Sequence, residues 1–511
     1  MNHDFKSYLE ITGEIGFVKK TVSSLVYTDG LPGAMLGELV IFEFGGVGQI
    51  SALKSSNVEI FSFSNTPITV GTRVARTNKT LEIPVGDELL GKVINPLGDP
   101  IYSIETLPEL KEVRPIDVSP LGIESRSRIK KQCETGVTVV DLLFPIGKGQ
   151  RELVIGDQKT GKSYFLWRAM LSQVKAGVIG IYVTIGKSKA VIKRLEESFR
   201  GVDVLPGMIF MATSSDDSPG MIYLAPYSAM TIAEYFRDKG RDVIIVFDDL
   251  TAHAKAYREI SLLAKRFPGR NSYPGDIFYI HSRLLERAGN FRSSKGDVSI
   301  TCLPVVETAY GDITGYIQTN IMSMTDGHLF FDRSLFIEGR RPAIDPFRSV
   351  TRVGRQTQNF LRRQIGQVLL TFLQSVEHLH GFASFEAELG ERVAKELKKE
   401  KRLLQIFDQT AYDLVPFNLQ VFIFGLAWGD SWIGKTENEI RLEIQKIIFS
   451  YESKIDIRKK IDLVVEDCAS LELLLVRIKS VQLSLEDLKN PSAEAFKPAV
   501  SGKDPKITES R

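Results

Sequence analysis

The sequence predicts a multidomain chain in which a small antiparallel β domain, a parallel α/β domain and an α-helical domain follow one another. Short β-rich segments separated by glycine turns occupy residues 1–84. Apolar runs alternate with longer amphipathic segments over 85–358, and amphipathic segments without β-rich runs dominate 359–488. The 511 residues provide material for several domains of the usual size, about 100–200 residues each.

The predicted strands of residues 1–84 are short, as in EIGFVKKTV, ELVIFEF, VEIFSFSN and PITVGTRVA. Glycine turns separate them, and no segment shows helical periodicity. Such strands favour a small antiparallel barrel or sandwich.

Strand–helix alternation follows the segment PVGDELLGKVINPLGDPI. It pairs RELVIG with SYFLWRAMLSQVKA, VIGIYVTIG with KAVIKRLEESFR, and RDVIIVFDDL with AKAYREISLLA. The apolar runs are unbroken, which indicates strands buried on both faces of a parallel sheet.

Helical patterns such as NFLRRQIGQVLLTFLQSVEHLH and ENEIRLEIQKIIFSYESK fill residues 359–488. The last stretch, 489–511, is polar and rich in Pro, Ser and Lys, which predicts a disordered tail. The most apolar segment, LQVFIFGLAWG at 419–429, is about half as long as a bilayer-spanning helix. We therefore expect the chain to reach a membrane only through a partner.

Charge and cysteine content narrow the possible functions. With 65 basic and 63 acidic residues the net charge is +2, so we expect no nucleic-acid partner. The run KELKKEKR at 395–402 mixes both signs at helical spacing and is interpreted as a solvated helix face. Cys133, Cys302 and Cys468 fit no metal spacing, which favours buried free thiols in a reducing cytosol.

The strongest functional motif is the octapeptide GDQKTGKS at 156–163. It follows a predicted strand and opens a predicted helix, so glycine turns and the helix start can aim N–H groups at phosphates. We interpret it as a nucleotide phosphate loop rather than a chance glycine turn. The residues expected to bind the nucleotide here are Gly156, Asp157, Gln158, Lys159, Thr160, Gly161, Lys162 and Ser163.

A metal ligand is predicted beside this loop. Lys162 would reach the terminal phosphates and the Ser163 hydroxyl would coordinate Mg²⁺. The apolar strand VIIVFDDL ends in Asp248 and Asp249. Two acids after a strand are commonly a helix cap or surface charges, but together with a phosphate loop they favour a metal role, with Asp248 the better candidate.

Longer passages resemble the alpha subunit of F-type ATP synthases from about residue 13 to 430. They include TGVTVVDLLFPIGKGQRELVIGDQKTGKS, LAPYSAMTIAEYFRDKGRDVIIVFDDL, AYREISLLAKRFPGRNSYPGDIFYIHSRLLERA and RRPAIDPFRSVTRVG. The resemblance implies an N-terminal β-barrel, a central RecA-type nucleotide-binding domain and a C-terminal helical bundle. After residue 430 the likeness is limited to helical character.

The resemblance also implies a complex. Three alpha subunits would alternate with three beta subunits around a rotating central-stalk gamma subunit, with ATP or ADP and Mg²⁺ as ligands. The assembly would lie peripherally on the cytoplasmic face of the inner or plasma membrane and couple proton flow to ATP synthesis or hydrolysis.

Family members usually begin with a longer segment that docks the delta subunit, whereas the strands here begin soon after MNHDFKSYLE. We expect either a different docking of delta or a divergent complex with a reduced stalk.

Lys187 indicates that the chain's own site is non-catalytic. Hydrolysis requires a group that orients and activates water. The resemblance implies a glutamate at this position in catalytic beta subunits and usually glutamine in alpha subunits, whereas the segment here reads IYVTIGKSKAV. A lysine is cationic at neutral pH and cannot accept the proton.

Only some of the residues expected to bind the nucleotide, including those near adenine, match the pattern of the family. Family loops typically read GDRQTGKT, so Gln158 and Lys159 depart from it. Phe336 and Arg341 in LFIEGRRPA match adenine contacts by spacing, although Phe336 is equally explained by core packing. The two family glutamines are not reproduced cleanly in LLQIFDQTAYD, and Gln405 or Gln409 is expected to substitute.

Arg352 in RSVTRVG matches the arginine that alpha subunits contribute to a neighbouring beta active site. Guanidinium donors suit the charge of a transferring phosphoryl group. Ser323 in IMSMTDG matches an interface serine near the same pocket, and FPGRNSYPGD at 267–276 resembles the sleeve around the shaft or is a plain turn.

Two other functions use the same fold. A homohexameric export-type ATPase would carry the catalytic glutamate that Lys187 replaces. A Rho-like RNA translocase would need aromatic and basic residues in the N-terminal domain, and VEIFSFSN in a near-neutral chain gives little support.

Overall fold

The computed structural model describes residues 5–101, 110–294, 296–383, 391–410, 413–429 and 431–480. The predicted tail at 489–511 lies outside these residues. Two compact units divide the chain. The first contains the residues up to Arg128, Gly149–Ile155 and Gly177–Asp326, and the second contains Ile129–Lys148, Gly156–Ala176 and the residues from Gly327 onward.

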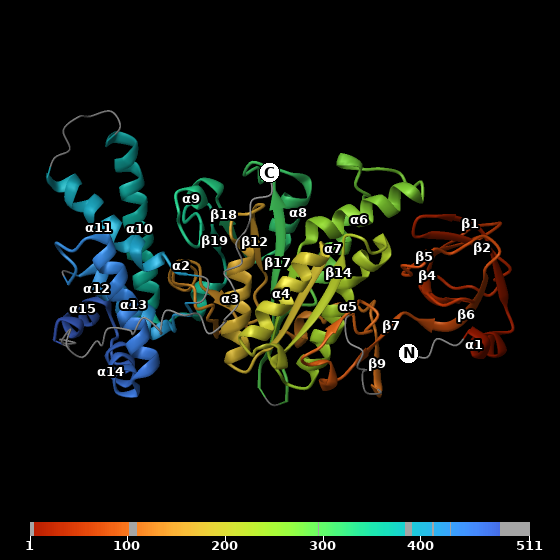
Figure 1. Cartoon of the computed structure of the whole chain (residues 1–511), viewed down its shortest axis with the longest axis horizontal. Coiled ribbons are helices and arrows are strands. Elements are labelled where there is room, and N and C mark those ends of the chain that lie inside the picture. The colour runs from red at the N-terminus through yellow and green to blue at the C-terminus, as the bar shows by residue number, and fades with distance from the viewer. Residues whose placement is uncertain are drawn as a thin grey trace. The chain divides into compact units, whose positions relative to one another are not determined.

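A closed antiparallel barrel begins the first unit (Figure 1). Its strand order is β1-β2-β5-β4-β3-β6. The strands are β1 (Ile15–Val22), β2 (Leu25–Asp29), β3 (Glu38–Phe42), β4 (Val47–Leu53), β5 (Val58–Ser62) and β6 (Arg73–Thr80). Val40, Ile60 and Val74 are fully buried inside it, and closure leaves no free sheet edge.

One element of the barrel region was not predicted. Helix α1 (Phe5–Thr12) packs against β6, although the sequence pattern predicted no helix before residue 84. Phe5 is its one buried side chain, so the helix depends on this tertiary contact and not on a broad apolar face.

The parallel sheet of the first unit has the order β12-β17-β15-β13-β14-β8, and β16 pairs antiparallel with β17. Its register places Thr184 opposite Asp248 and Ile181 opposite Ile245. All of β15 is buried, as the unbroken apolar run predicted. The strands are β8 (Val93–Ile94), β12 (Glu152–Asp157), β13 (Ile179–Lys187), β14 (Met208–Ser214), β15 (Val243–Asp248), β16 (Gly289–Phe291) and β17 (Val298–Thr308).

Helices pack on this sheet, and α5 contacts β13, β14, β15 and β17. The helices of this part of the unit are α4 (Lys189–Gly201), α5 (Pro219–Asp238), α6 (Leu250–Leu263), α7 (Ile277–Leu285) and α8 (Tyr316–Met324). A separate two-stranded sheet pairs β7 (Glu82–Val85) with β9 (Glu112–Pro115).

The second unit joins the phosphate-loop helix to the C-terminal helices. It contains the antiparallel strand pairs β10–β11 and β18–β19 and a set of helices (Figure 1). Its strands are β10 (Gln132–Cys133), β11 (Ile146–Gly147), β18 (Gly327–Phe331) and β19 (Val350–Thr351). Its helices are α2 (Thr138–Leu143), α3 (Lys162–Lys175), α9 (Arg333–Ile337), α10 (Phe360–Ala383), α11 (Glu391–Phe407), α12 (Phe417–Trp428), α13 (Glu437–Ser453), α14 (Ile455–Glu466) and α15 (Leu471–Ser480).

The most apolar segment of the sequence forms helix α12. It contacts α11, α13, α14 and α15, so apolar side chains on every side of it are covered. The charged run 395–402 lies on α11, where Lys395 and Lys398 are exposed. Lys399 instead lies 3.5 Å from the ring centre of Trp428, so this face is only partly solvated.

These observations confirm the predicted fold class: an antiparallel barrel, a parallel α/β region and a helical C-terminal region. The three cysteines are buried free thiols, as predicted. Within the part of the chain that the structure describes, no helix has both the length and the apolarity to span a bilayer.

A buried histidine pair lies in the first unit. His253 Nδ1 and His281 Nε2 are 3.1 Å apart, and His253 Nε2 lies 3.1 Å from the carbonyl oxygen of Tyr223. Because a carbonyl only accepts, His253 donates from Nε2 and accepts at Nδ1 from His281. Burial lowers the pKa of His253 to about 4, so both rings are held neutral.

This pair predicts acid sensitivity of the first unit. Between pH 6.5 and 4 the unfolded chain binds the proton that folded His253 excludes, so stability falls as the pH falls through this window. The loss from His253 is about 3 kcal/mol. We expect His253→Gln to flatten the dependence of the melting temperature on pH, whereas the exposed His378→Gln leaves it unchanged. Equal slopes in wild type and His253→Gln would contradict this assignment.

Candidate functional site

The phosphate loop lies in the second unit and is shaped by two glycines. Gly161 has φ +90°, in the left-handed region, and forms the N-cap of α3. A Cβ on Gly156 would lie 2.3 Å from the carbonyl oxygen of Phe331, so only glycine permits this close backbone approach. Strand, turn and helix start thus adopt the arrangement in which backbone N–H groups bind phosphate.

Side chains within the loop close it on itself. Lys162 Nζ donates to the carbonyl oxygens of Gly156 at 2.7 Å and Asp157 at 2.5 Å. Thr160 Oγ1 donates to the same Asp157 carbonyl at 2.8 Å. These bonds keep the Lys162 ammonium within the loop, where a phosphate would meet it. Gln158, Lys159 and Ser163 are exposed.

Phe336 and Arg341 lie together beside this loop. The Arg341 guanidinium lies 3.5 Å from the ring centre of Phe336, and its Nη1 donates to the carbonyl oxygens of Phe336 and Arg340, each at 2.8 Å. A Cβ on Gly161 would lie 3.6 Å from the Phe336 ring. Phe336 is partly exposed, so it does not belong to a closed core.

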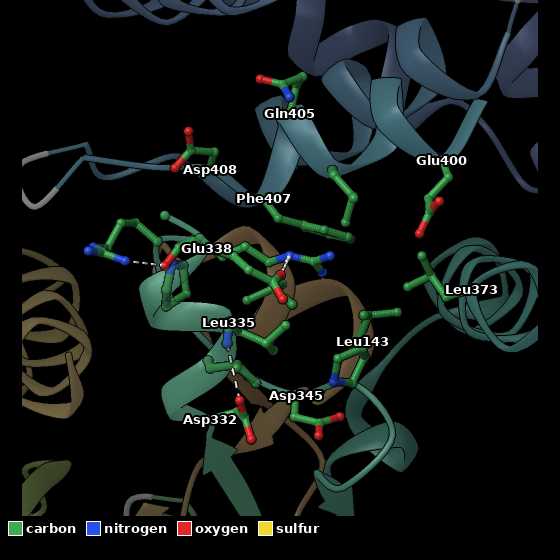
Figure 2. A pocket seen from close by; sticks show the side chains of 18 of the residues that line it. Leu143, Asp332, Leu335, Glu338, Asp345, Leu373, Glu400, Gln405, Phe407 and Asp408 are labelled. Atoms are coloured by element: carbon green, nitrogen blue, oxygen red, sulfur yellow. Dashed lines mark hydrogen bonds and ion pairs between the residues drawn. The ribbon is translucent and has the colours of Figure 1, made fainter. Parts of the chain in front are cut away.

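A pocket of about 520 Å³ opens beside α9 in the second unit (Figure 2). Arg341 and Gln405 line it, and Figure 2 shows Leu335 of α9, Leu373 of α10 and Gln405 of α11 around it. Its acidic lining consists of Asp332, Glu338, Asp345, Glu377, Glu400, Asp408 and Glu437. Arg340, Arg341 and Arg441 also line it, and the remaining excess of carboxylates disfavours an anionic group in this pocket.

The two candidate glutamines have different surroundings. Thr138 N donates to Gln409 Oε1 at 2.8 Å, and Gln409 Nε2 donates to the Gly136 carbonyl at 3.1 Å, so both ends of this amide bind the backbone. The Gln405 amide makes only long contacts, 3.3 Å to Glu437 and 3.4 Å from Arg441. Gln405 also lines a second pocket of about 240 Å³ together with Gln409.

The predicted metal ligand Asp248 lies in the first unit, where a lysine holds it. Lys187 Nζ lies 2.9 Å from Asp248 Oδ1 and 2.8 Å from Asp249 Oδ2. The Tyr182 hydroxyl donates to Asp248 Oδ2 at 2.9 Å, and the amide of Ala252 donates to Asp249 Oδ1 at 2.7 Å. Each oxygen of the two buried carboxylates therefore has a donor from the protein itself.

Electrostatics keep Lys187 charged. Burial lowers the pKa of its ammonium, but the charges of Asp248 and Asp249 outweigh burial and raise the pKa above its ordinary value. Glu307 Oε1 lies 3.8 Å away and adds a third carboxylate. Sequence reasoning did not find Tyr182 or Glu307, although Glu307 near the end of an apolar strand is the same kind of signal as Asp248.

The Asp248–Asp249 pair does not by itself form a cluster of metal ligands. Among the described residues, no group of three or more His, Cys, Asp or Glu side chains is placed to hold a metal. Mg²⁺ needs near-octahedral oxygen ligands at about 2.0–2.1 Å. The Lys187 ammonium is paired with both carboxylates, within 3 Å of each.

The predicted interface residues lie in different units. Arg352 is exposed and directly follows β19, which pairs with β18 through Gly327–Thr351 and His328–Val350. The end of β19, just before Arg352, is fixed because Thr351 Oγ1 donates to the Pro145 carbonyl at 3.0 Å. Burial lowers the pKa of His328, and the positive charge of Arg352 adds to this effect. Ser323, in the first unit, is exposed on α8, and its hydroxyl donates to the Asn320 carbonyl at 2.7 Å.

The wall formed by Phe336 predicts a specific loss of affinity. Phe336→Ala removes the ring under Arg341, and base–aromatic stacking contributes about 1–3 kcal/mol. We expect ATP to bind about tenfold more weakly, measured by isothermal titration calorimetry of the full chain. The matched control is Ile337→Ala, a neighbour on α9 whose side chain is exposed. A fall in melting temperature without a change in affinity would instead assign Phe336 to packing.

Comparison with known proteins identifies the family of the chain. Residues 136–351 match the model of the ATP synthase alpha/beta family, nucleotide-binding domain. ATP synthase subunit alpha from Staphylococcus aureus strain JH9 is 40% identical over 421 residues, covering 82% of this chain and 84% of the relative. The same protein from strain Newman gives the same values. The chain therefore belongs to the ATP synthase alpha/beta family, as an alpha-type member.

Proposed function

We propose that this chain is a non-catalytic, regulatory subunit of a rotary ATP synthase. It holds ATP or ADP at its own phosphate loop without hydrolysing it. It supplies Arg352 to a catalytic site of a neighbouring beta subunit, where synthesis or hydrolysis driven by proton flow takes place. The observation that carries the non-catalytic part of the proposal is the ion-paired Lys187.

Support for nucleotide holding comes from the second unit. Lys162 is held inside the loop by bonds to two loop carbonyls, and Phe336 and Arg341 form a stacked wall next to Gly161. Of the two glutamines, Gln405 is the better candidate to contact the base, because backbone groups already use both ends of the Gln409 amide. Ser163 is exposed at the helix start and remains the candidate metal ligand on this side.

Support for the absence of catalysis comes from the first unit. A general base must accept a proton from water, and it must have a free lone pair to do so. Lys187 is cationic, and the carboxylates within 4 Å of it are paired with its ammonium. Lys187 therefore lacks the properties of the missing base.

The proposed partners follow from family membership and from exposed residues. Arg352 and Ser323 would face beta subunits, which alternate with this chain in a ring. The loop 267–276 would face the gamma shaft, and its Phe267 is 93% exposed. A delta subunit of the peripheral stalk is proposed as a further partner, and the complex would lie on the cytoplasmic face of the membrane. Nucleic acid is not a proposed partner.

The full chain purified alone tests the proposal. We expect ATP to bind, measured by calorimetry, while phosphate release stays at the level of a buffer control. Robust turnover by the isolated chain would contradict the proposal and favour the homohexameric export-type ATPase. Turnover that requires RNA would favour the Rho-like translocase.

Arg352 is tested in the assembled complex with beta and gamma subunits. Arg352→Ala is expected to lower steady-state ATPase turnover by about 10³-fold or more, the lower range for arginine fingers. Assembly and nucleotide binding by this chain should not change, because Arg352 lies outside the phosphate loop and its walls. The matched control is Arg355→Ala, another exposed arginine three residues further on. Wild-type turnover in Arg352→Ala would refute the role.

A further inference from the structure

His328 in the second unit holds the backbone that leads to Arg352. Strand β18 pairs with β19 in a register that sets His328 opposite Val350. The Nε2 atom of His328 lies 2.8 Å from the carbonyl oxygen of Arg348, and because a carbonyl only accepts, the histidine donates this bond. His328 is buried, so the bond is shielded from water. The segment that ends in Arg352 is therefore attached to β18 through this side chain.

The strand register also brings the charge of Arg352 close to His328. Side chains alternate between the two faces along a strand, so the position two residues after Val350 lies on the same face, and Arg352 takes it directly after β19 ends. Because His328 is opposite Val350, Arg352 is its diagonal neighbour. Diagonal neighbours lie about 7–8 Å apart, within reach of a long side chain. The positive charge of Arg352 accordingly adds to burial in disfavouring the charged form of His328.

The other charged groups of this segment have partners of their own. The Arg348 guanidinium lies 3.7 Å from the ring centre of Phe330 and 3.5 Å from Asp332 Oδ2. Asp345 Oδ1 accepts from the amide of Arg348 at 3.2 Å. Among the residues that the structure describes, Arg352 is thus the one whose charge acts on the histidine ring.

The neutral and the protonated ring affect Arg352 differently. Neutral His328 keeps its proton on Nε2 for the Arg348 carbonyl and carries no charge. A second proton, on Nδ1, leaves that bond in place but adds a positive charge beside Arg352, and like charges on one face repel each other. The guanidinium is then displaced from the position that the strand gives it. Small displacements of a group that acts on reacting atoms reduce turnover strongly.

We propose that His328 is a positioning residue for Arg352, which it holds in place when neutral and displaces when protonated. The contribution of Arg352 to the neighbouring catalytic site then falls as the pH falls. Burial and Arg352 lower the pKa of His328, so the ring is neutral at pH 7 and the fall occurs below its ordinary value of 6.5. This inference rests on the proposed role of Arg352 and adds regulation by pH to it.

Steady-state ATPase turnover of the assembled complex with beta and gamma subunits, measured from pH 8 to 5.5 and normalised to pH 8, tests the inference. We expect turnover of wild type to fall about threefold further than that of His328→Gln, the effect of a like charge about 7–8 Å away in a medium close to water. Glutamine can donate to the same carbonyl but does not titrate, so His328→Gln should also retain more turnover at pH 8 than His328→Ala. The acid sensitivity from His253 is common to these proteins and cancels from the comparison.

The pKa of His328 in the isolated full chain gives a second test, which needs no variant of the histidine. Coupling between two sites is reciprocal, so Arg352 acts on the proton of His328 as strongly as that proton acts on Arg352. A threefold effect corresponds to about 0.5 in pKa, and we expect the pKa of His328 to rise by about this amount in Arg352→Ala. The measurement is NMR of labelled histidine, and the matched control is the exposed Arg355→Ala, which should leave this pKa unchanged.

The control for the turnover profile is His378→Gln, an exposed histidine on α10 whose substitution should leave the wild-type profile unchanged. Equal normalised profiles of wild type and His328→Gln would overturn the inference and leave the role of Arg352 intact. An unchanged pKa of His328 in Arg352→Ala would overturn it as well, even if His328→Gln does not fold. Wild-type turnover in Arg352→Ala would instead refute the proposed function on which the inference rests.

Discussion

The Lys187 ammonium holds three carboxylates near the carboxyl ends of β13, β15 and β17, and the arrangement of this edge of the sheet depends on it. Without the ammonium, Asp248, Asp249 and Glu307 would be close like charges, two of them buried, and burial strongly disfavours an uncompensated charge. The carboxyl edge of a parallel sheet is where α/β folds bind ligands. In this chain the same edge is neutralised in part by the protein itself.

The barrel also contains a buried arginine that is paired with carboxylates. Arg76 Nε lies 3.1 Å from both carboxylate oxygens of Glu38, and its Nη1 lies 2.9 Å from Glu14. Both Arg76 and Glu38 are buried, so the pairing compensates charges that water cannot reach. In each case the strands bring together groups that lie far apart in the sequence, and the buried ion pairs constrain how these strands pair.

Local sequence patterns predicted the elements of this fold better than their assembly. Strand β15 and the loop Gly156–Ser163 followed from an unbroken apolar run and from glycine spacing, because both signals lie within a few residues. The division into two units did not follow, since Gly156–Ala176, which contains α3, belongs to the same compact unit as the residues from Gly327 onward. Helix α1 was missed because one buried side chain, Phe5, gives no periodic signal.

In the candidate site, too, contacts between residues far apart in the sequence could not be predicted. The pairing of Lys187 with Asp248 spans 61 positions, and that of Gln409 with Thr138 spans 271, so neither can be derived from spacing. The sequence did indicate that Lys187 is no base, because its charge is a property of the residue type. Whether that charge would face solvent or carboxylates depended on the strand register, and the register placed it on Asp248.

The cationic Lys187 at the position of a general base affects whether the site can hydrolyse a nucleotide or only bind it. Interactions that are equally strong with the ground state and the transition state increase affinity without accelerating reaction. Catalysis needs a group that accepts the proton as water is deprotonated, and the ammonium of Lys187 has no lone pair with which to do so. In the proposed function the chain therefore holds a nucleotide without turnover, and its proposed contribution to the chemical step is the exposed guanidinium of Arg352, which directly follows a paired strand.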